Sequence, residues 1–86
     1  MAYSFVPTVL TIRNIRIAIY SNDHPPPHVH AIGRDGARAR FLLNCPAGPV
    51  VLTAQASFRK VDIVDIGRGV AAELPAICAK WEATHG

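Results

Sequence analysis

The sequence predicts an α+β domain, in which a small antiparallel sheet of four to five strands precedes two helices packed on one face. Three observations predict it. Apolar residues alternate at period two in the first half and recur at helical spacing in the second half. Half of the 86 residues are hydrophobic, enough for a compact core. The length fits a single domain, residues 1–86.

The first predicted element is a hairpin spanning residues 8–20, which begins after Pro7. A two-residue loop, Arg13-Asn14, pairs Ile12 with Ile15. The same register pairs Leu10 with Ile17, so every large aliphatic side chain reaches one face of the sheet. Tight hairpin loops favour positive φ, to which an arginine at position 13 is poorly suited.

A second hairpin is predicted from residues 28–32 and 37–43. A three-residue loop, residues 34–36, with glycine in the left-handed position, pairs His30 with Arg40 and Val29 with Phe41. Polar and apolar faces then separate. A two-residue loop, Asp35-Gly36, would set His30 against Phe41 and mix the faces, so we predict the three-residue loop.

The second half predicts a short strand at residues 50–53 and then two helices. Ser57 is the expected N-cap of the first helix. Two glycines, Gly67 and Gly69, weaken the end of this helix. Pro75 suits the first turn of the second helix, which continues to residue 85. Trp81 is assigned to the core. Cys45 and Cys78 could form at most one bridge, and in a reducing compartment they are expected to be small buried hydrophobes without a bond between them.

Residues 21–30 are the most unusual part of the chain, with three of its four histidines and three of its seven prolines. The triproline must end the preceding strand and is expected to form a stiff polyproline II segment, which would separate His24 from His28 by about 12 Å. A cis-proline would shorten that distance. His28 and His30 are two apart on a strand and therefore point the same way.

The histidine pair permits four interpretations. His28 and His30 could bind a metal ion, with His24 or Asp23 completing the ligands. They could act as general base and acid on RNA without a metal ion, with His24 as an accessory. The segment could also dock a partner without chemistry, or simply stiffen and cap the sheet. The residues expected to bind a ligand or phosphate on the same face are Arg38, Arg40, Tyr20, Arg16, Asn22 and Asp23.

Charge and motifs restrict the function further. The formal net charge of +3 leans toward an anionic partner, either nucleic acid or an acidic protein. No apolar run is long enough for a membrane span, and the N-terminus does not resemble a signal peptide, so a cytoplasmic protein with no membrane partner is expected. There is no phosphate-binding glycine loop, GxSxG or HExxH motif. We predict that the protein has no cofactor. A bound divalent metal ion is the alternative that the sequence leaves open.

A resemblance to a known family rests on four parts of the sequence. They are the string Tyr20-Ser21-Asn22-Asp23-His24-Pro25-Pro26-Pro27-His28-Val29-His30, the segment from Pro7 to Leu10, Asp35-Gly36, and Trp81 with His85-Gly86. The chain resembles a widespread bacterial family of small proteins of unknown function, part of which is described as the DhiT-type toxin of type II toxin–antitoxin pairs. The resemblance implies a compact cytoplasmic α+β domain and a small antitoxin-like protein encoded nearby. It implies no particular reaction. The signature of the family corresponds to Asn22, Asp23, His24, His28 and His30.

These observations together predict a toxin component that cleaves or binds RNA through a histidine and arginine face. The alternative is a small non-enzymatic module that binds a protein partner or a metal ion. Enzymatic activity is left open because no carboxylate or second base stands at a fixed sequence spacing from the histidines. Formation of a homo-oligomer is left open as well.

Overall fold

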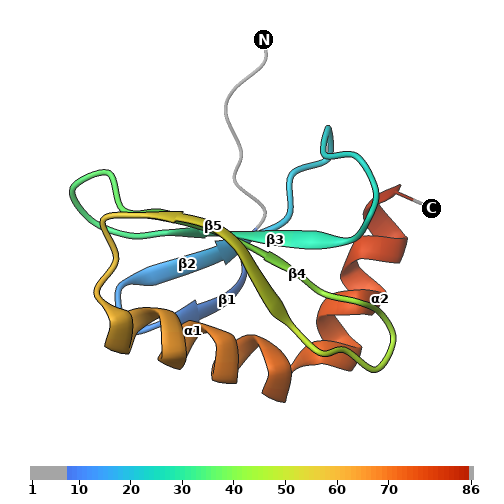
Figure 1. The fold of residues 1–86 in the computed structure, drawn as a ribbon. Helices are drawn as coiled ribbons and strands as arrows, with labels where there is room; N and C mark the ends of the chain where they lie inside the picture. The colour runs from blue at the N-terminus through green and yellow to red at the C-terminus, as the bar shows by residue number, and fades with distance from the viewer. Residues whose placement is uncertain (1–7, 86) are drawn as a thin grey trace, which may run out of the picture.

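The computed structural model describes residues 8–85 and contains five strands followed by two helices (Figure 1). The elements are β1 (Thr8–Ile12), β2 (Ile15–Ala18), β3 (His28–Ile32), β4 (Arg38–Leu42), β5 (Val51–Ala56), α1 (Lys60–Ala72) and α2 (Leu74–His85). The predicted α+β class is confirmed. Pro7, which was predicted to precede the first strand, and Gly86 lie outside the described residues.

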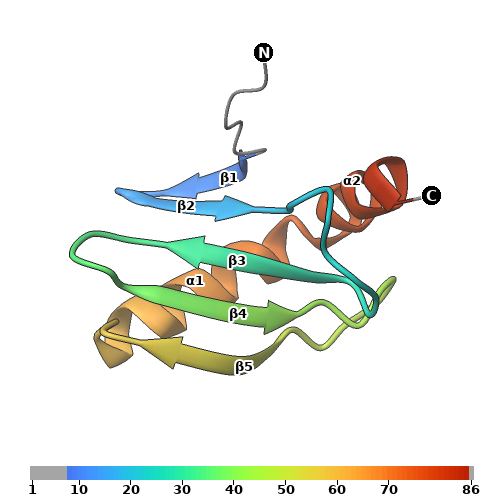
Figure 2. The ribbon, with the colours of Figure 1, turned by 90° about the horizontal axis from the view of Figure 1, so that it is seen from above.

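The five strands form one antiparallel sheet in chain order, from β1 at one edge to β5 at the other (Figure 2). In the first hairpin Ile12 pairs with Ile15 and Leu10 with Ile17, as predicted. Arg13 adopts a φ of 53° in the loop, a conformation that side-chain-bearing residues adopt only at a cost. The register shifts between Thr8 and Leu10, where β1 carries a bulge.

The second hairpin has the predicted three-residue loop, with Gly36 at a φ of 80°. His30 pairs with Arg40 and Val29 pairs with Phe41. Backbone N–H groups of Gly33 and Ala37 close the loop through hydrogen bonds to Ala37 and Arg34 carbonyls. The register follows from the separation of faces: Val29 and Phe41 are buried beneath the sheet, whereas Arg40 is exposed on the open face.

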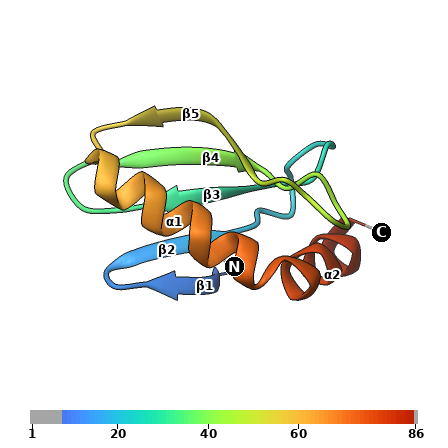
Figure 3. The same ribbon diagram turned by 60° about the horizontal axis from the view of Figure 1, so that its bottom comes forward.

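The helices cover the apolar face of the sheet, and their buried residues join one core (Figure 3). Helix α1 crosses under the strands, and α2 then runs along the end of the sheet toward the β2–β3 connection. The core is built from thirteen buried side chains, among them Ile17, Val29, Ile66 and Trp81. Neither helix of the described chain has the length and apolarity to cross a membrane.

Helix α1 departs from the prediction at both ends. Ser57 is not its N-cap: the residue has a φ of 69° and lies in the bend before the helix, whose N-cap is Arg59 without a side-chain capping bond. Gly67 and Gly69 do not end the helix. A Cβ atom on Gly69 would lie 2.5 Å from Cδ1 of Ile12, so glycine here allows α1 to pack closely on β1.

Three further predictions need correction: the extent of β5, the conformation of the triproline and the state of the cysteines. Strand β5 is longer than expected, because it continues to Ala56 as the partner of Arg38 in β4. The triproline is not a continuous trans polyproline II segment, since the Pro25–Pro26 peptide bond is cis. The prediction of unbonded cysteines is wrong: Cys45 and Cys78 form a disulfide, which sequence separation alone could not indicate.

Candidate functional site

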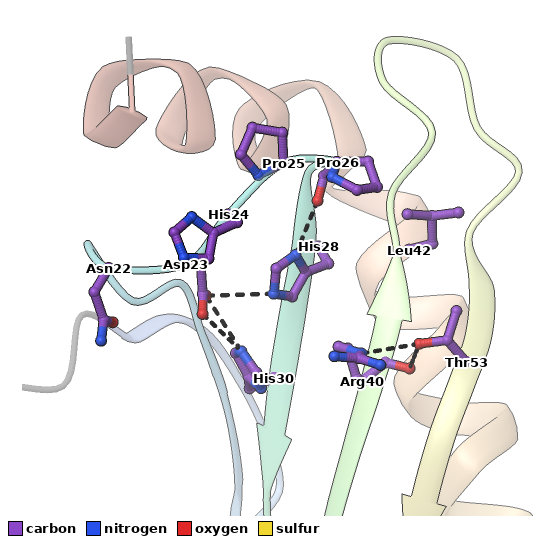
Figure 4. Close-up of a pocket in the computed structure, with 10 residues that line it drawn as sticks. All are labelled: Asn22, Asp23, His24, Pro25, Pro26, His28, His30, Arg40, Leu42 and Thr53. Carbon is purple, nitrogen blue, oxygen red and sulfur yellow. Dashed lines mark hydrogen bonds and ion pairs between the residues drawn. The ribbon is translucent and has the colours of Figure 1, made fainter.

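The histidine site lies where the β2–β3 connection, residues 19–27, folds back over the start of β3 (Figure 4). His28 and His30 project from β3 toward the open side of the sheet, as their spacing predicts. Asp23 comes from the connection and reaches both of them. The side chains of Asp23 and His28 are 14% and 12% exposed, which leaves little room for water to screen their interaction.

The Nε2 atoms of both histidines face the same carboxylate, that of Asp23. Nε2 of His30 lies 3.2 Å from each carboxylate oxygen of Asp23. Nε2 of His28 lies 3.5 Å from Oδ2 of the same residue. One donor atom from each of these three residues falls within 4.8 Å of the other two. Three potential ligands therefore converge on one point.

The tautomer of His28 is determined by its other ring nitrogen. Nδ1 lies 2.9 Å from the carbonyl oxygen of Pro26, and a carbonyl can only accept, so Nδ1 carries a proton. In a neutral ring Nε2 then presents its lone pair toward Asp23. A ring lone pair and a carboxylate that face the same point suit a shared cation, and the bond of the other ring nitrogen to a carbonyl is typical of ligating histidines.

A short turn holds Asp23 in place. Its backbone N–H donates to the Tyr20 carbonyl at 3.1 Å. In return, the Tyr20 N–H donates to Oδ2 of Asp23 at 3.2 Å. This reciprocal pairing fixes the carboxylate against the start of β3, and both partners belong to the set predicted to bind a ligand.

Aromatic rings support the histidines from two sides. The Tyr20 ring centroid lies 4.9 Å from that of His30, and the Trp81 centroid lies 5.3 Å from that of His28. Trp81 is a core residue as predicted. His85 stacks on Trp81 at 3.7 Å, and its Nε2 lies 3.1 Å from the Tyr20 carbonyl oxygen. The last turn of α2 is thereby joined to the turn that holds Asp23.

His85 was not among the predicted site residues. Its sequence signal is the spacing of four from Trp81, which places both rings on one helix face. That spacing does not reveal contact with Tyr20, because the contact joins residues 65 apart in the sequence. Pro26, whose carbonyl fixes the His28 ring, was also missed, since any residue supplies such a carbonyl.

A pocket of about 570 Å³ opens beside the three converging residues. His24 and Asn22 line it from the β2–β3 connection, and Arg40 lines it from β4 (Figure 4). The Arg40 Nε donates to the Thr53 hydroxyl at 3.2 Å. His24 is thus placed at the pocket but outside the group of three ligand atoms.

The other predicted arginines lie farther along the open face. Arg38 lines a neighbouring pocket of about 360 Å³, which shares His30 and Arg40 with the first. Arg16 of β2 and Arg38 of β4 both pair with Ile32 of β3, one on each side, so they stand in one row across the sheet. The structure therefore brings Arg40 to the histidines directly, and Arg38 to the adjoining pocket. Arg16 lines neither pocket.

The geometry of the three ligand atoms fits a metal ion. Two ligands at about 2.0–2.1 Å from a tetrahedral zinc ion are roughly 3.3 Å apart, close to the observed separations of 3.2 and 3.5 Å. Ligating histidines usually donate their second nitrogen to a carbonyl or carboxylate, as His28 does to Pro26. Three protein ligands leave a coordination position open for water or substrate.

Comparison with known proteins gives one match. The family described as a domain of unknown function, DUF4160, matches residues 14–82, which include the whole histidine site up to Trp81. No curated protein matches this chain, and no solved structure does.

Proposed function

Because this chain belongs to the DUF4160 family, whose description names no activity, we propose a function from the site itself. Asp23, His28 and His30 bind a divalent metal ion, and the occupied site cleaves RNA held by Arg40. The single observation that carries the proposal is the convergence of two Nε2 atoms on one carboxylate. The arrangement supports a metal ion better than metal-free acid–base chemistry, because both nitrogens of His28 already face protein oxygens.

Zinc is the ion that this ligand set favours. Two imidazoles and one carboxylate form the catalytic set of several zinc hydrolases. The side chains of Asp23 and His28 are largely shielded from solvent, and the site opens on the adjoining pocket. A zinc ion held by Asp23, His28 and His30 would supply a coordinated water whose pKa lies near 7 and would polarise a phosphoryl oxygen. The residues of the chain supply the rest: they fix the ligands, hold the phosphate and position a proton donor.

Arg40 supports a phosphate-bearing substrate. Its guanidinium lines the same pocket as the histidines, while the bond to Thr53 uses only Nε and leaves the terminal nitrogens for a phosphate. Beyond it, Arg38 lines the adjoining pocket. A nucleic-acid strand that crosses both pockets would place one phosphate at Arg40 and a further one toward Arg38.

His24 is proposed as the proton donor to the leaving oxygen. It lines the pocket and is exposed, and neither of its ring nitrogens has a hydrogen-bond partner among the described residues. An imidazole can both donate and accept a proton, which suits proton transfer to an RNA leaving group. His24 would therefore act on the substrate rather than on the metal ion.

The biological role that we propose is that of the toxin in a bacterial toxin–antitoxin pair. Its support is the resemblance carried by residues 20–30 and the RNA chemistry argued above. Expression without the partner protein should arrest bacterial growth, and substitution of both His28 and His30 by alanine should abolish the arrest at equal soluble protein level.

The biochemical test uses purified protein stripped with a chelator, zinc titration and a labelled single-stranded RNA. We expect one zinc ion per chain and RNA cleavage only in its presence. Asp23→Asn keeps an oxygen for the Tyr20 N–H but removes the charge of a direct ligand. Zinc affinity should therefore fall by more than the about 10- to 100-fold that loss of an outer-shell partner causes, and cleavage should be lost. Asp35→Asn, an exposed loop residue, is the control with the same chemical change.

His24→Ala separates binding from catalysis, because it should lower cleavage while zinc affinity remains that of the wild type. Cleavage by the chelated wild-type protein, or by Asp23→Asn at full rate, would rule out the metal-dependent mechanism. Absence of zinc binding at the concentrations of the titration would remove its basis.

A second candidate function is a metal-binding module without catalysis. It is favoured by the occupation of both His28 nitrogens, since a ring held this way serves as a ligand and not as a proton carrier. Zinc would then stabilise the β2–β3 connection for binding a protein partner. Zinc binding with no RNA cleavage in the same assay would select this function over the first.

A further inference from the structure

The β5 edge of the sheet is more exposed to solvent than the β1 edge. All six residues of β5 are exposed, whereas three of the five β1 residues are partly buried. No described strand pairs with the outer side of β5. Its sequence, VLTAQA, contains neither the charged residues nor the proline that commonly protect an edge strand from pairing. A bulge at Thr53 is its one protective feature.

Exposed apolar side chains occur on the helix side of β5 and on α1, and we call this set, Leu52, Val61 and Val64, the apolar strip. Leu52 pairs with the buried Phe41, so its side chain points to the helix side, yet it is 39% exposed. On α1, Val61 and Val64 are 53% and 43% exposed. Exposed large apolar side chains offer surface that a partner can cover.

The contacts of α1 show which way these valines face. Gly69 approaches Ile12 of β1, and Asp62 and Asp65 both bind Arg13 in the β1–β2 loop. One flank of the helix is therefore directed to β1. By helical spacing, Val64 falls on the flank away from β1, and Val61 lies one turn earlier on the exposed side of the helix.

The open side of the same edge is basic. The bond from Arg40 to Thr53 draws its guanidinium over β5. The neighbours of Arg40 and Arg38 on β5 are Ala54 and Ala56, whose small side chains leave both guanidiniums accessible from the edge. None of the six carboxylates of the chain lies on β5.

We propose that β5 is the docking edge for an extended segment of a protein partner, which adds a sixth strand. Successive residues of a strand point to opposite faces, so the segment must alternate. Acidic side chains would meet Arg38 and Arg40 on the open face, and apolar side chains would cover Leu52 and Val64 on the helix face. A second copy of this chain fits less well, because paired β5 edges would bring the same arginines together.

The test uses a soluble fluorescent peptide that alternates glutamate with valine and leucine, followed by fluorescence anisotropy and by amide NMR shifts. We expect binding with shifts centred on residues 51–56. One control peptide replaces glutamate by lysine, and another carries a central proline that cannot complete the ladder; both should bind at least about tenfold more weakly.

The matching protein variant is Leu52→Lys with Val64→Lys, both at exposed positions that tolerate charge. It should weaken peptide binding by about tenfold or more. Ala76→Lys with Ala79→Lys, two exposed positions of α2, adds the same charge elsewhere and should not weaken it. Circular dichroism confirms that both variants fold.

The proposal would be overturned by equal binding of the lysine peptide, by shifts at residues 8–12 instead of 51–56, or by loss of binding in the α2 control variant. Concentration-dependent dimerisation of the protein alone, with shifts at residues 51–56, would assign the edge to a second copy and would also overturn it. The assay contains no metal ion and no RNA, so its result is independent of the function proposed for the histidine site.

Discussion

At the scale of single residues, the charge of the Asp62 carboxylate is held by two arginines. Hydrogen bonds from Arg59 at 3.1 Å, together with one from Arg13 at 2.7 Å, hold the pKa of its carboxyl below the usual 3.8. The folded protein therefore binds this proton less readily than the unfolded chain. The resulting stabilisation is complete above pH 3.8 and is lost as the pH falls through the lowered pKa.

We predict that thermal denaturation between about pH 5 and pH 2 shows a steeper loss of stability in the wild type than in Asp62→Asn. The asparagine variant lacks the titrating group and should be less stable near neutral pH, with the two curves converging at low pH. Asp35→Asn, with no ion pair among the described residues, should follow the wild type. Parallel curves for wild type and Asp62→Asn would contradict the contribution of this carboxyl.

The residues of the histidine site differ in how far the sequence could place them. His28 and His30 are two apart on a strand that period-two alternation identifies, so their common direction was predictable. The position of Asp23 was not, because it depends on a turn whose hydrogen bonds join Tyr20 and Asp23 within the β2–β3 connection. Sequence spacing carries no information on which way such a connection folds back.

At the scale of elements, the disulfide joins two parts of the fold that the sheet does not connect. Cys45 lies between β4 and β5, and Cys78 lies in α2, the helix whose last turn supports the histidine site. A bridge across 33 residues restricts the unfolded chain. By the chain-entropy estimate it stabilises the fold by about 3–4 kcal/mol.

We predict that a reducing agent lowers the free energy of unfolding of the oxidised protein by about 3–4 kcal/mol, measured by urea denaturation. A variant with Cys45→Ala and Cys78→Ala should be insensitive to the reductant. Two freely titrating thiols in the native, unreduced protein would contradict the bond, as would identical denaturation curves with and without reductant.

The elements themselves were predictable where a repeating pattern had only one good solution. The β3–β4 register follows from the need to separate Val29 and Phe41 from His30 and Arg40. The start of α1 was not predictable from Ser57, because the chain needs a bend there to leave the sheet edge and pass beneath it. Gly69 reads as a helix breaker in the sequence, yet its missing side chain is what lets α1 approach Ile12.

At the scale of the whole molecule, the two proposals meet at Arg40. On one side this residue lines the histidine pocket; on the other its bond to Thr53 brings it over the β5 edge. A nucleic-acid phosphate and a carboxylate of a docked strand would need the same guanidinium. Binding of the partner segment and binding of RNA should therefore exclude each other, although the metal ligands and the apolar strip are separate surfaces.

We predict that the glutamate-containing peptide displaces a labelled RNA from the zinc-loaded protein, measured by loss of RNA anisotropy at increasing peptide concentration. The lysine peptide, which cannot pair with Arg40, is the control. In the Leu52→Lys, Val64→Lys variant, RNA binding should persist while displacement by the peptide is lost. Simultaneous binding of peptide and RNA would show that Arg40 serves only one of the two sites, and the residue would then belong to whichever ligand Arg40→Ala weakens.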